Sequence, residues 1–592
     1  MPIVSPSPPP FSQAAPLPKL TPEYISSAYP KDLELIQAQV FFRHGERTPV
    51  KKKLIRSDSP WPFCQRANFL HAEFMKAVGR FVPRQETMPV PNPDRMAQSQ
   101  DQRKQSDDHS MYTDKTATLK CGIEYVPAKW SVRLGKSPLD TSVSTAVDHN
   151  GNWDPKNCEM GQLSDIGLDT LYRTGQFLRS LYVDKLGFIP AAPTGATGPG
   201  SGSSSGSHGT GKLHDWLYIR TTDYSRVIQS THALLVGLYP GYPKSAWDGD
   251  WTAFNKDFLQ LFPIHTRLHK DETMHGNFGC YNFIRHFIDV DVKQANELKW
   301  ILDIYRQTIQ LPDGLGKRAQ EMMDKPYFGS NFHPIYDELV SMKAHGQGLP
   351  NGVTMDFLNS LGIASHHQWT ERATLLSGQR LGFGRLVDNV VRTLTQAAQL
   401  SREQVDDPVI RPRIGEQSKG DLRLAPGAIR PPSTPDETPG VPKLALYGAH
   451  DITVAPLAII MGATNREWLP FASMLTFELF KSKNGGTLQN AAVEGTTKAA
   501  DRSGLDSKAA KAPPSPRPIS VPDSLDPAGY YVRVRLNDQI LQVPTCEPPG
   551  KHHEGVGSSM CTLAAFFEHV APLVPSEADY KAECGTMPGA FD

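Results

Sequence analysis

The sequence has no apolar run long enough to cross a membrane as a helix. Such a helix needs about 20 consecutive apolar residues, and no stretch of the 592 residues has that character. The opening MPIVSPSPPPFSQAAPLPKL lacks the charged and then apolar layout of a secretory signal, and no arginine precedes Arg43, which counts against mitochondrial import by the usual route. We expect an intracellular protein, cytoplasmic or mitochondrial, that is not classically secreted.

Cysteine is scarce, and acceptor sites for N-glycosylation are missing. The 7 cysteines are odd in number and none forms a CxxC pair, so the usual zinc-binding spacing is excluded. No asparagine is followed by x-Ser/Thr with a non-proline middle residue, which also favours an intracellular protein. Disulfides among Cys546, Cys561 and Cys584 are left open, but buried free thiols are the expectation.

An excess of either charge is also absent. The 62 basic residues balance the 62 acidic ones, so the chain has no long-range field for nucleic acid or for an anionic membrane. Anion recognition must therefore be local, and we expect a small substrate. The length predicts two domains or one large two-part fold, and nothing in the sequence fixes the oligomeric state.

Two cations and a histidine follow an apolar strand near the amino terminus. Residues Leu35 to Phe42 end in β-branched and aromatic side chains, which is typical of a strand. The loop that follows presents Arg43, His44 and Arg47 at the strand's carboxyl end, where open α/β sheets bind their ligands. A basic surface turn is the alternative for this cluster taken alone.

Two later segments have related layouts. The strand-like KLALYGA is followed by His450 and Asp451, and the segment from Tyr218 to Arg226 predicts a strand, a turn and the start of a helix. Arg226 then lies in the first helical turn, where the helix dipole favours an anion. A second histidine after an apolar strand lowers the weight of the surface-turn alternative.

Together these segments resemble the histidine acid phosphatases, the second branch of the histidine phosphatase superfamily. In that family an RHGxRxP loop and a distant His-Asp pair form one site, and both patterns are present here as RHGERTP and His450-Asp451. The resemblance implies an α/β fold, in which a phosphoglycerate-mutase-like three-layer core carries an inserted, mostly α-helical cap domain.

The resemblance also implies roles for individual residues. His44 would be the nucleophile that forms a phosphohistidine, and Asp451 the general acid and base. The residues implied to bind phosphate are Arg43, Arg47, Arg226 and His450. No metal or other cofactor is implied. Because guanidinium groups surround it, His44 should stay neutral to lower pH than a free histidine.

We divide the chain by composition and periodicity. The expected units are a disordered lead-in (1–30), the first half of the α/β core (31–244), a helical cap (245–405), a linker (406–440) and the second half of the core (441–585), with a low-complexity insertion at about 483–526. Residues 51 to about 160 and 190–212 read as long irregular excursions.

The periodicities predict several elements inside these units. One helix is expected after an N-cap at Ser164, and one after a cap at Thr222 or Asp223. Three more are expected over Tyr281–Gln310, Phe328–Ala344 and Glu371–Gln399. Another should follow Asp451, with Pro456 in its first turn and Gly462 at its end, and a last one should cover 560–572. The strands are expected over Ser473–Phe480 and in a hairpin from Tyr530 to Val543.

Within the family, the resemblance extends to the lysophosphatidic acid phosphatases, through the stretches Glu467–Ala472 and Met474–Phe480 and through Cys561 and Cys584. It implies a monoacyl glycerol phosphate as substrate and a mitochondrial location. A phytase or other inositol-phosphate phosphatase is the enzymatic alternative, although more cysteines, glycosylation acceptors and a lysine-rich rim would be expected of it. A catalytically silent phosphate- or lipid-binding scaffold is the alternative from another class.

Overall fold

The protein was analysed as a computed structural model. The structure describes residues 14–50, 61, 64, 66–67, 158, 160–191, 216–239, 262, 264–267, 272–276, 280–285, 332–350, 353–406, 441–464, 467–483 and 527–585. Most of the expected excursions over 51–160 and 190–212, the linker over 406–440 and the insertion over 483–526 lie outside these residues, as does the predicted helix over Tyr281–Gln310 beyond residue 285.

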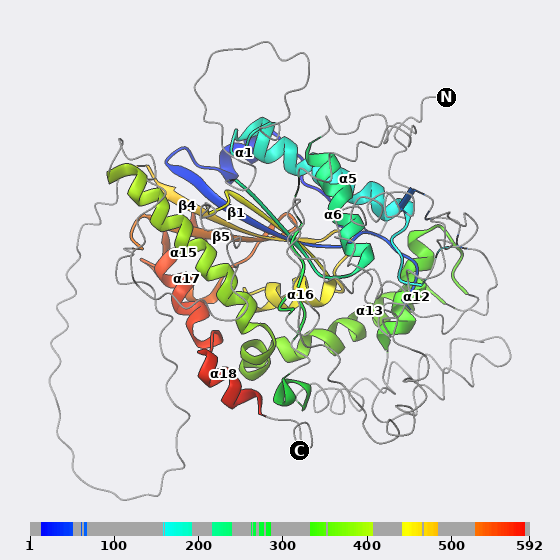
Figure 1. The fold of residues 1–592 in the computed structure, drawn as a ribbon. Helices are drawn as coiled ribbons and strands as arrows, with labels where there is room; N and C mark the ends of the chain where they lie inside the picture. The colour runs from blue at the N-terminus through cyan, green and yellow to red at the C-terminus, as the bar shows by residue number, and fades with distance from the viewer. Residues whose placement is uncertain are drawn as a thin grey trace, which may run out of the picture.

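A mixed eight-stranded sheet forms the centre of the described part of the chain (Figure 1). Its strands are β1 (Leu33–Arg43), β2 (Leu217–Thr221), β3 (Leu444–Ala449), β4 (Met474–Ser482), β5 (Tyr530–Leu536), β6 (Gln539–Ile540), β7 (His552–His553) and β8 (Gly557–Thr562). The strand order is β2-β3-β1-β4-β5-β8-β7, with β6 paired to β5. β1, β2 and β3 run parallel, whereas β4 is antiparallel to β1.

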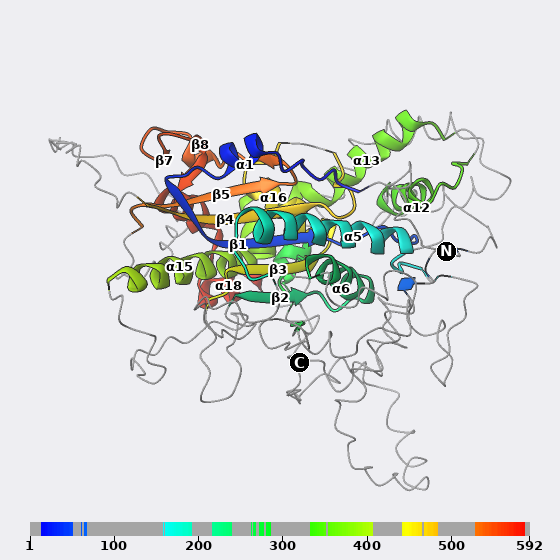
Figure 2. The ribbon, with the colours of Figure 1, turned by 90° about the horizontal axis from the view of Figure 1, so that it is seen from above.

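Helices cover both faces of this sheet, which gives three layers (Figures 1 and 2). One face carries α1 (Pro22–Ala28), α5 (Asp165–Leu178) and α6 (Ser225–Leu238), and the other carries α15 (Gly384–Asp406), α16 (Asp451–Ile460), α17 (Leu563–Val570) and α18 (Glu577–Cys584). Successive residues of β1 point to opposite faces, so Val40 and Phe42 enter one core while Phe41 enters the other. Burial on both faces explains why the end of β1, from Val40 to Phe42, is continuously apolar.

A second helical region lies beside the carboxyl end of β1. Here α12 (Phe332–Ala344) packs on α13 (Met355–Thr370), and a small core of their apolar residues also includes Trp61. The predicted helix over Phe328–Ala344 is therefore present from Phe332 onward, and residues 328–331 lie outside the described residues. These two helices occupy part of the chain assigned to the cap, and that domain division remains a prediction.

Two parts of the predicted division differ from the structure. The end of the expected cap forms α15, which packs on the sheet: Val390 lies in the same core as Phe41, and its carbonyl accepts a hydrogen bond from Gln39 at 3.1 Å. The expected lead-in is ordered from Ala14 onward, because it pairs with Phe471 there and then forms α1. Periodicity identified the α15 helix but could not show which surface it covers.

Several boundaries also need correction. Ser164 does cap α5, but α6 is capped at Tyr224 without a side-chain bond, and Thr222 bonds to His450 instead. Pro456 lies inside α16 rather than in its first turn, whereas Gly462 does follow that helix with φ +94°. The closing helix α17 begins only at Leu563, since the preceding residues complete β8.

All the described cysteines lie in disulfides. The pairs are Cys64–Cys158, Cys280–Cys584 and Cys546–Cys561, with Cα atoms 5.7, 4.8 and 5.2 Å apart. The expectation of buried free thiols is therefore wrong for these six, because paired cysteines at such separations satisfy disulfide geometry. Cys121 lies outside the described residues. Among the described helices, none has both the length and the apolar character needed to cross a membrane.

Candidate active site

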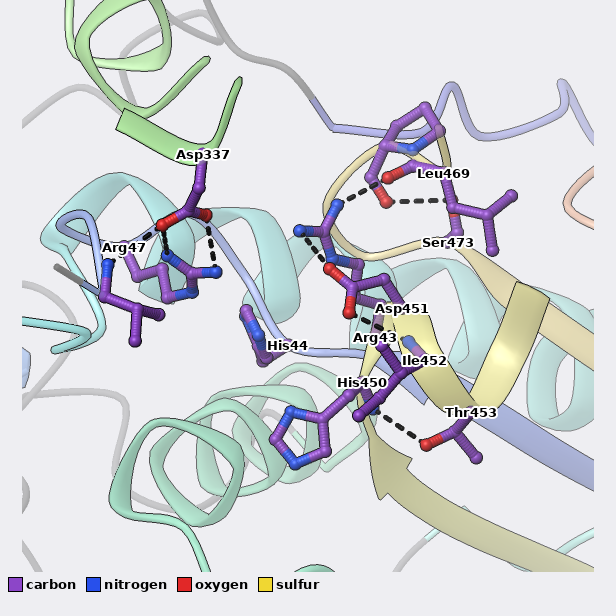
Figure 3. A network of polar contacts seen from close by, with 12 residues as sticks. Arg43, His44, Arg47, Asp337, His450, Asp451, Ile452, Thr453, Leu469 and Ser473 are labelled. Atoms are coloured by element: carbon purple, nitrogen blue, oxygen red, sulfur yellow. Dashed lines mark hydrogen bonds and ion pairs between the residues drawn. The ribbon is translucent and has the colours of Figure 1, made fainter. Parts of the chain in front are cut away.

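The loops that follow β1 and β3 meet at one edge of the sheet. Because the two strands are parallel and adjacent, with Arg43 opposite Ala449, the residues after them emerge side by side. The backbone N–H of His44 donates to the carbonyl of Ala449 at 3.2 Å. The His44 and His450 rings lie 5.6 Å apart at 76° (Figure 3). Residues more than 400 positions apart in the sequence thus share one site.

The amino end of α5 holds the loop after β1 in place. Ser164 donates to the carbonyl of Glu46 through both its backbone N–H and its hydroxyl, each at 3.0 Å. A Cβ on Gly45 would lie 2.3 Å from the carbonyl oxygen of Gly167, so only glycine fits there. The loop therefore packs closely against α5, which fixes the backbone that follows His44.

The tautomer of His44 follows from the hydrogen bond that its ring makes with Gly45. The side chain is 1% exposed, and Nδ1 lies 2.9 Å from the carbonyl oxygen of Gly45. A carbonyl oxygen only accepts, so Nδ1 must carry the proton. Nε2 therefore keeps its lone pair, which is the form a nucleophilic imidazole needs.

His44 is neutral in this environment. Burial lowers its pKa most, and the positive charges of Arg226, Arg47 and Arg43 lower it further, to well below the usual 6.5. The direction agrees with the expectation from the sequence, but burial contributes more than the arginines do. Nε2 consequently remains unprotonated at acidic pH.

Arg43 links the loop that carries His44 to Asp451. One terminal nitrogen of its guanidinium lies 2.7 Å from Asp451 Oδ2, and the other donates to the carbonyl of Leu469. The guanidinium also stacks 4.1 Å from the centroid of Phe471. These contacts fix the plane of a side chain whose fork matches phosphoryl oxygens.

Asp451 is ionised before any substrate binds. Burial raises the pKa of its carboxyl, but the charge of Arg43 and smaller contributions from His333 and Arg47 leave it below the usual 3.8. The backbone N–H of Ile452 also donates to Oδ1 at 2.8 Å. A general-acid role therefore requires that a bound ligand first raise this pKa.

Asp337 is a site residue that the sequence did not reveal. It projects from α12 and holds Arg47 through two contacts, Oδ1 at 2.7 Å and Oδ2 at 3.1 Å (Figure 3). Burial raises its pKa, but Arg47 dominates together with further hydrogen bonds, and the net value falls to about 2. No motif surrounds Asp337, so only the contact with Arg47 identifies it.

Arg226 and His450 complete the group. Arg226 is the strongest charged influence on both His44 and His450, after burial, so its guanidinium lies near both rings. It also stacks 4.8 Å from the ring of Tyr224. Thr222 holds His450 by a 2.9 Å contact between Oγ1 and Nε2. All six residues predicted for the site thus come together, while their individual roles remain predictions.

The comparisons with known proteins agree with this arrangement. Residues 34–334, which make up half of the chain, match the histidine phosphatase superfamily (branch 2). A probable acid phosphatase of Schizosaccharomyces pombe is 25% identical over 580 residues, covering 94% of this chain and 95% of the relative. Lysophosphatidic acid phosphatase type 6 of Pongo abelii is 22% identical and covers 60% of this chain and 68% of its own.

Among solved structures, the apo phytase of Hafnia alvei covers 94% of this chain and 100% of its own at 12% identity, with a TM-score of 0.42. A likeness of this strength says nothing about substrate. The family match and the acid phosphatase relatives, in contrast, agree with a site of one neutral histidine and convergent arginines. The chain belongs to the histidine phosphatase superfamily, branch 2, and is a histidine acid phosphatase.

Proposed function

We propose that the protein hydrolyses phosphate monoesters through a phosphohistidine on His44, with Asp451 as general acid and base. The observation that carries this proposal is the convergence of a neutral, Nδ1-protonated imidazole with buried arginines and a carboxylate. A phosphate monoester resists attack because of its own charge. Arg43, Arg47 and Arg226 supply the opposite charge.

In the first step, Nε2 of His44 attacks phosphorus as the ester P–O bond breaks. The bond electrons leave with the alcohol oxygen, which takes the proton of Asp451 and departs as the neutral alcohol. The phosphoryl group stays on Nε2. The 2.9 Å contact between Nδ1 and the carbonyl of Gly45 stabilises the positive charge that develops on the imidazole ring.

In the second step, the carboxylate of Asp451 takes a proton from water. The water oxygen attacks phosphorus, the N–P bond breaks, and its electrons return to Nε2. Inorganic phosphate leaves and His44 is neutral again. Asp451 ends this step protonated, so it can serve as the acid of the next turnover.

Substrate binding can produce the protonated form of Asp451 that the first turnover needs. In the free protein Arg43 pairs with Asp451 at 2.7 Å and keeps its pKa low. A bound phosphate dianion competes for Arg43 and adds negative charge beside the carboxyl, and both effects raise that pKa. An enzyme molecule that starts with ionised Asp451 can thus gain the acid form when an ester binds.

For the substrate, we propose a lysophosphatidic acid, a monoacyl glycerol phosphate. The support is the similarity to lysophosphatidic acid phosphatase type 6. An inositol phosphate is the alternative. An intracellular location also remains a proposal, and it has to account for three disulfides, which form most readily in oxidising compartments.

The test combines turnover with trapping of the intermediate. Purified protein is expected to hydrolyse p-nitrophenyl phosphate best at acidic pH, and rapid alkaline denaturation during turnover should preserve an adduct of 80 Da, the mass of HPO₃, on the peptide containing His44. His44→Ala, with an unchanged circular dichroism spectrum, should lose both turnover and adduct. An adduct on another residue, or turnover by His44→Ala, would overturn the proposal. Lysophosphatidate and phytate assayed side by side decide the substrate.

A further inference from the structure

Four aromatic side chains from three separate elements gather beside the Arg43–Asp451 pair. His333 and Tyr336 lie on α12, Trp369 lies on α13, and Trp468 precedes β4. The ring of His333 is 4.6 Å from that of Trp468 and 5.5 Å from that of Trp369, and the rings of Tyr336 and Trp468 are 6.0 Å apart. We call these four residues the aromatic wall.

The wall is tied to the site through its neighbours. Trp468 directly precedes Leu469, whose carbonyl accepts from the Arg43 guanidinium. His333 stands one helical turn before Asp337, the residue that holds Arg47. The wall therefore begins beside the groups that hold Arg43 and Arg47.

The wall is exposed enough to meet a ligand. Each of its four side chains is only partly buried, and none belongs to the fully buried core. Partly exposed aromatic rings clustered beside convergent charged residues are typical of an apolar binding surface.

The wall contains no lysine or arginine. Burial lowers the pKa of His333, and although Asp337 and Asp451 raise it, the net value stays below 6.5. Burial raises the pKa of Tyr336 to about 12, so its phenol is neutral. The residue before Trp468 is the exposed Glu467. Such a surface favours apolar groups and supplies no lysine or arginine for additional phosphates.

The leaving alcohol must lie against Asp451 to receive its proton, so the rest of the alcohol extends over the groups around Asp451. Trp468 is next to Leu469, which bonds to Arg43, and His333 stands one turn before Asp337. These links place the wall beside the Arg43–Asp451 pair. From this geometry we infer that the aromatic wall is the subsite for the alcohol portion of the substrate and selects monoesters with an apolar body, such as an alkyl or acyl chain, over polyanionic inositol phosphates. This inference rests on the proposed phosphatase mechanism.

The test compares hexyl phosphate, a monomeric alkyl ester, with methyl phosphate, which is too short to reach the wall. In the wild type, kcat/KM should be at least tenfold higher for hexyl phosphate. Trp468→Ala should raise the KM for hexyl phosphate about tenfold, because the chain loses its apolar partner, and should change kcat and the methyl phosphate values less than twofold. Phytate should be hydrolysed less efficiently than hexyl phosphate.

Competitive inhibition by inorganic phosphate separates a subsite from a structural effect. If Trp468 only supports Arg43 through Leu469, the inhibition constant of phosphate and both esters will change together in Trp468→Ala, which would overturn the inference. Tyr531→Ala is the matched control, since Tyr531 on β5 is also a partly buried aromatic residue, with its ring centroid 4.9 Å from that of His553 on β7. It should leave all constants unchanged.

A second variant keeps the test usable if Trp468→Ala does not fold. Trp369→Leu should give the same selective rise in KM for hexyl phosphate, about threefold. If wild-type protein hydrolyses p-nitrophenyl phosphate but treats hexyl and methyl phosphate alike, the subsite inference fails while the phosphatase mechanism stands. If p-nitrophenyl phosphate is not hydrolysed at all, the mechanism itself fails.

Discussion

Two clusters of buried arginines and carboxylates lie on the central sheet, one at the carboxyl end of β1 and one across β4 and β5. In the first, Arg43 pairs with Asp451 and Arg47 with Asp337. In the second, Glu478 pairs with both Arg533 and Arg535, at 2.7 and 3.2 Å. The residue types and the degree of burial are alike, so the difference between them lies in how fully each charge is satisfied.

We call the Glu478 cluster closed because several side chains bond to its carboxylate, and the Asp451 cluster open because fewer groups do. The carboxylate of Glu478 accepts from two tyrosines, Tyr29 at 2.7 Å and Tyr182 at 3.1 Å, as well as from the two arginines. Asp451, in contrast, has Arg43 on one oxygen and only the N–H of the next residue on the other. The closed cluster fixes α1 and two strands to each other, whereas the open cluster keeps charged groups that a ligand can still contact.

The largest expected effect comes from breaking the open cluster at its carboxylate. Asp451→Asn removes the proton donor, so an alkyl phosphate should lose about 1,000-fold in kcat, whereas an aryl phosphate with a good leaving group should lose about tenfold. Steady-state kinetics on hexyl and p-nitrophenyl phosphate measure this split. Equal losses on both substrates would argue against Asp451 as the general acid.

A smaller loss is expected at Asp337, which acts through Arg47. Asp337→Asn keeps the size of the side chain but weakens the two contacts that orient the guanidinium, so kcat/KM should fall about 10- to 100-fold. The matched control is Asp388→Asn, which breaks the exposed Asp388–Arg392 pair of 2.7 Å and should change activity less than twofold. Similar effects from both variants would remove Asp337 from the site.

The closed cluster should respond in the opposite way. Glu478→Gln leaves Arg533 and Arg535 buried without their counter-charge, which should cost about 3 to 5 kcal/mol in the free energy of unfolding. Protein that remains folded should keep kcat within twofold of the wild type, because Glu478 lies away from the chemistry. Urea unfolding and p-nitrophenyl phosphate turnover are measured on the same preparation, and a large fall in kcat without a loss of stability would contradict the comparison.

The smallest effect is the dependence of stability on pH. Burial raises the pKa values of Glu478 and Asp337, but their arginines outweigh it and lower both to about 2. Groups with a lowered folded-state pKa stabilise the protein above their unfolded values of about 4, and this contribution is lost as pH falls from there toward 2. Each should be worth about 2 to 3 kcal/mol. Urea unfolding at pH 6 and pH 3 should show a smaller acid loss in Glu478→Gln than in the wild type.

The sequence predicted the parts of the site that lie next to strands. Arg43 and His44 follow one apolar run and His450 another, and parallel strands bring their carboxyl ends to one edge. The sequence did not show that these strands are neighbours, so the convergence became visible only with the strand order in the structure. The motif and the strand pattern pointed to the same chemistry because the backbone itself positions these residues.

Contacts between residues that are far apart in the chain leave no such pattern in the sequence. Asp337 meets Arg47 across 290 positions, and a carboxylate within a helix is ordinarily expected on the solvent face. Cys280 and Cys584 are 304 positions apart, so no local spacing predicts their disulfide. The face that α15 covers is likewise set by its partners on the sheet and not by its own period.

The position of β1 has a consequence for how the protein is made. Its two neighbours in the sheet, β3 and β4, begin at Leu444 and Met474, so both edges of this apolar strand stay unpaired until more than three quarters of the chain has left the ribosome. Long-range pairing of this kind is slow and exposes strand edges to other chains. A nascent or prematurely terminated chain would carry the nucleophile on an unprotected strand, and we expect chaperone occupancy during synthesis to persist until Ser482 has emerged.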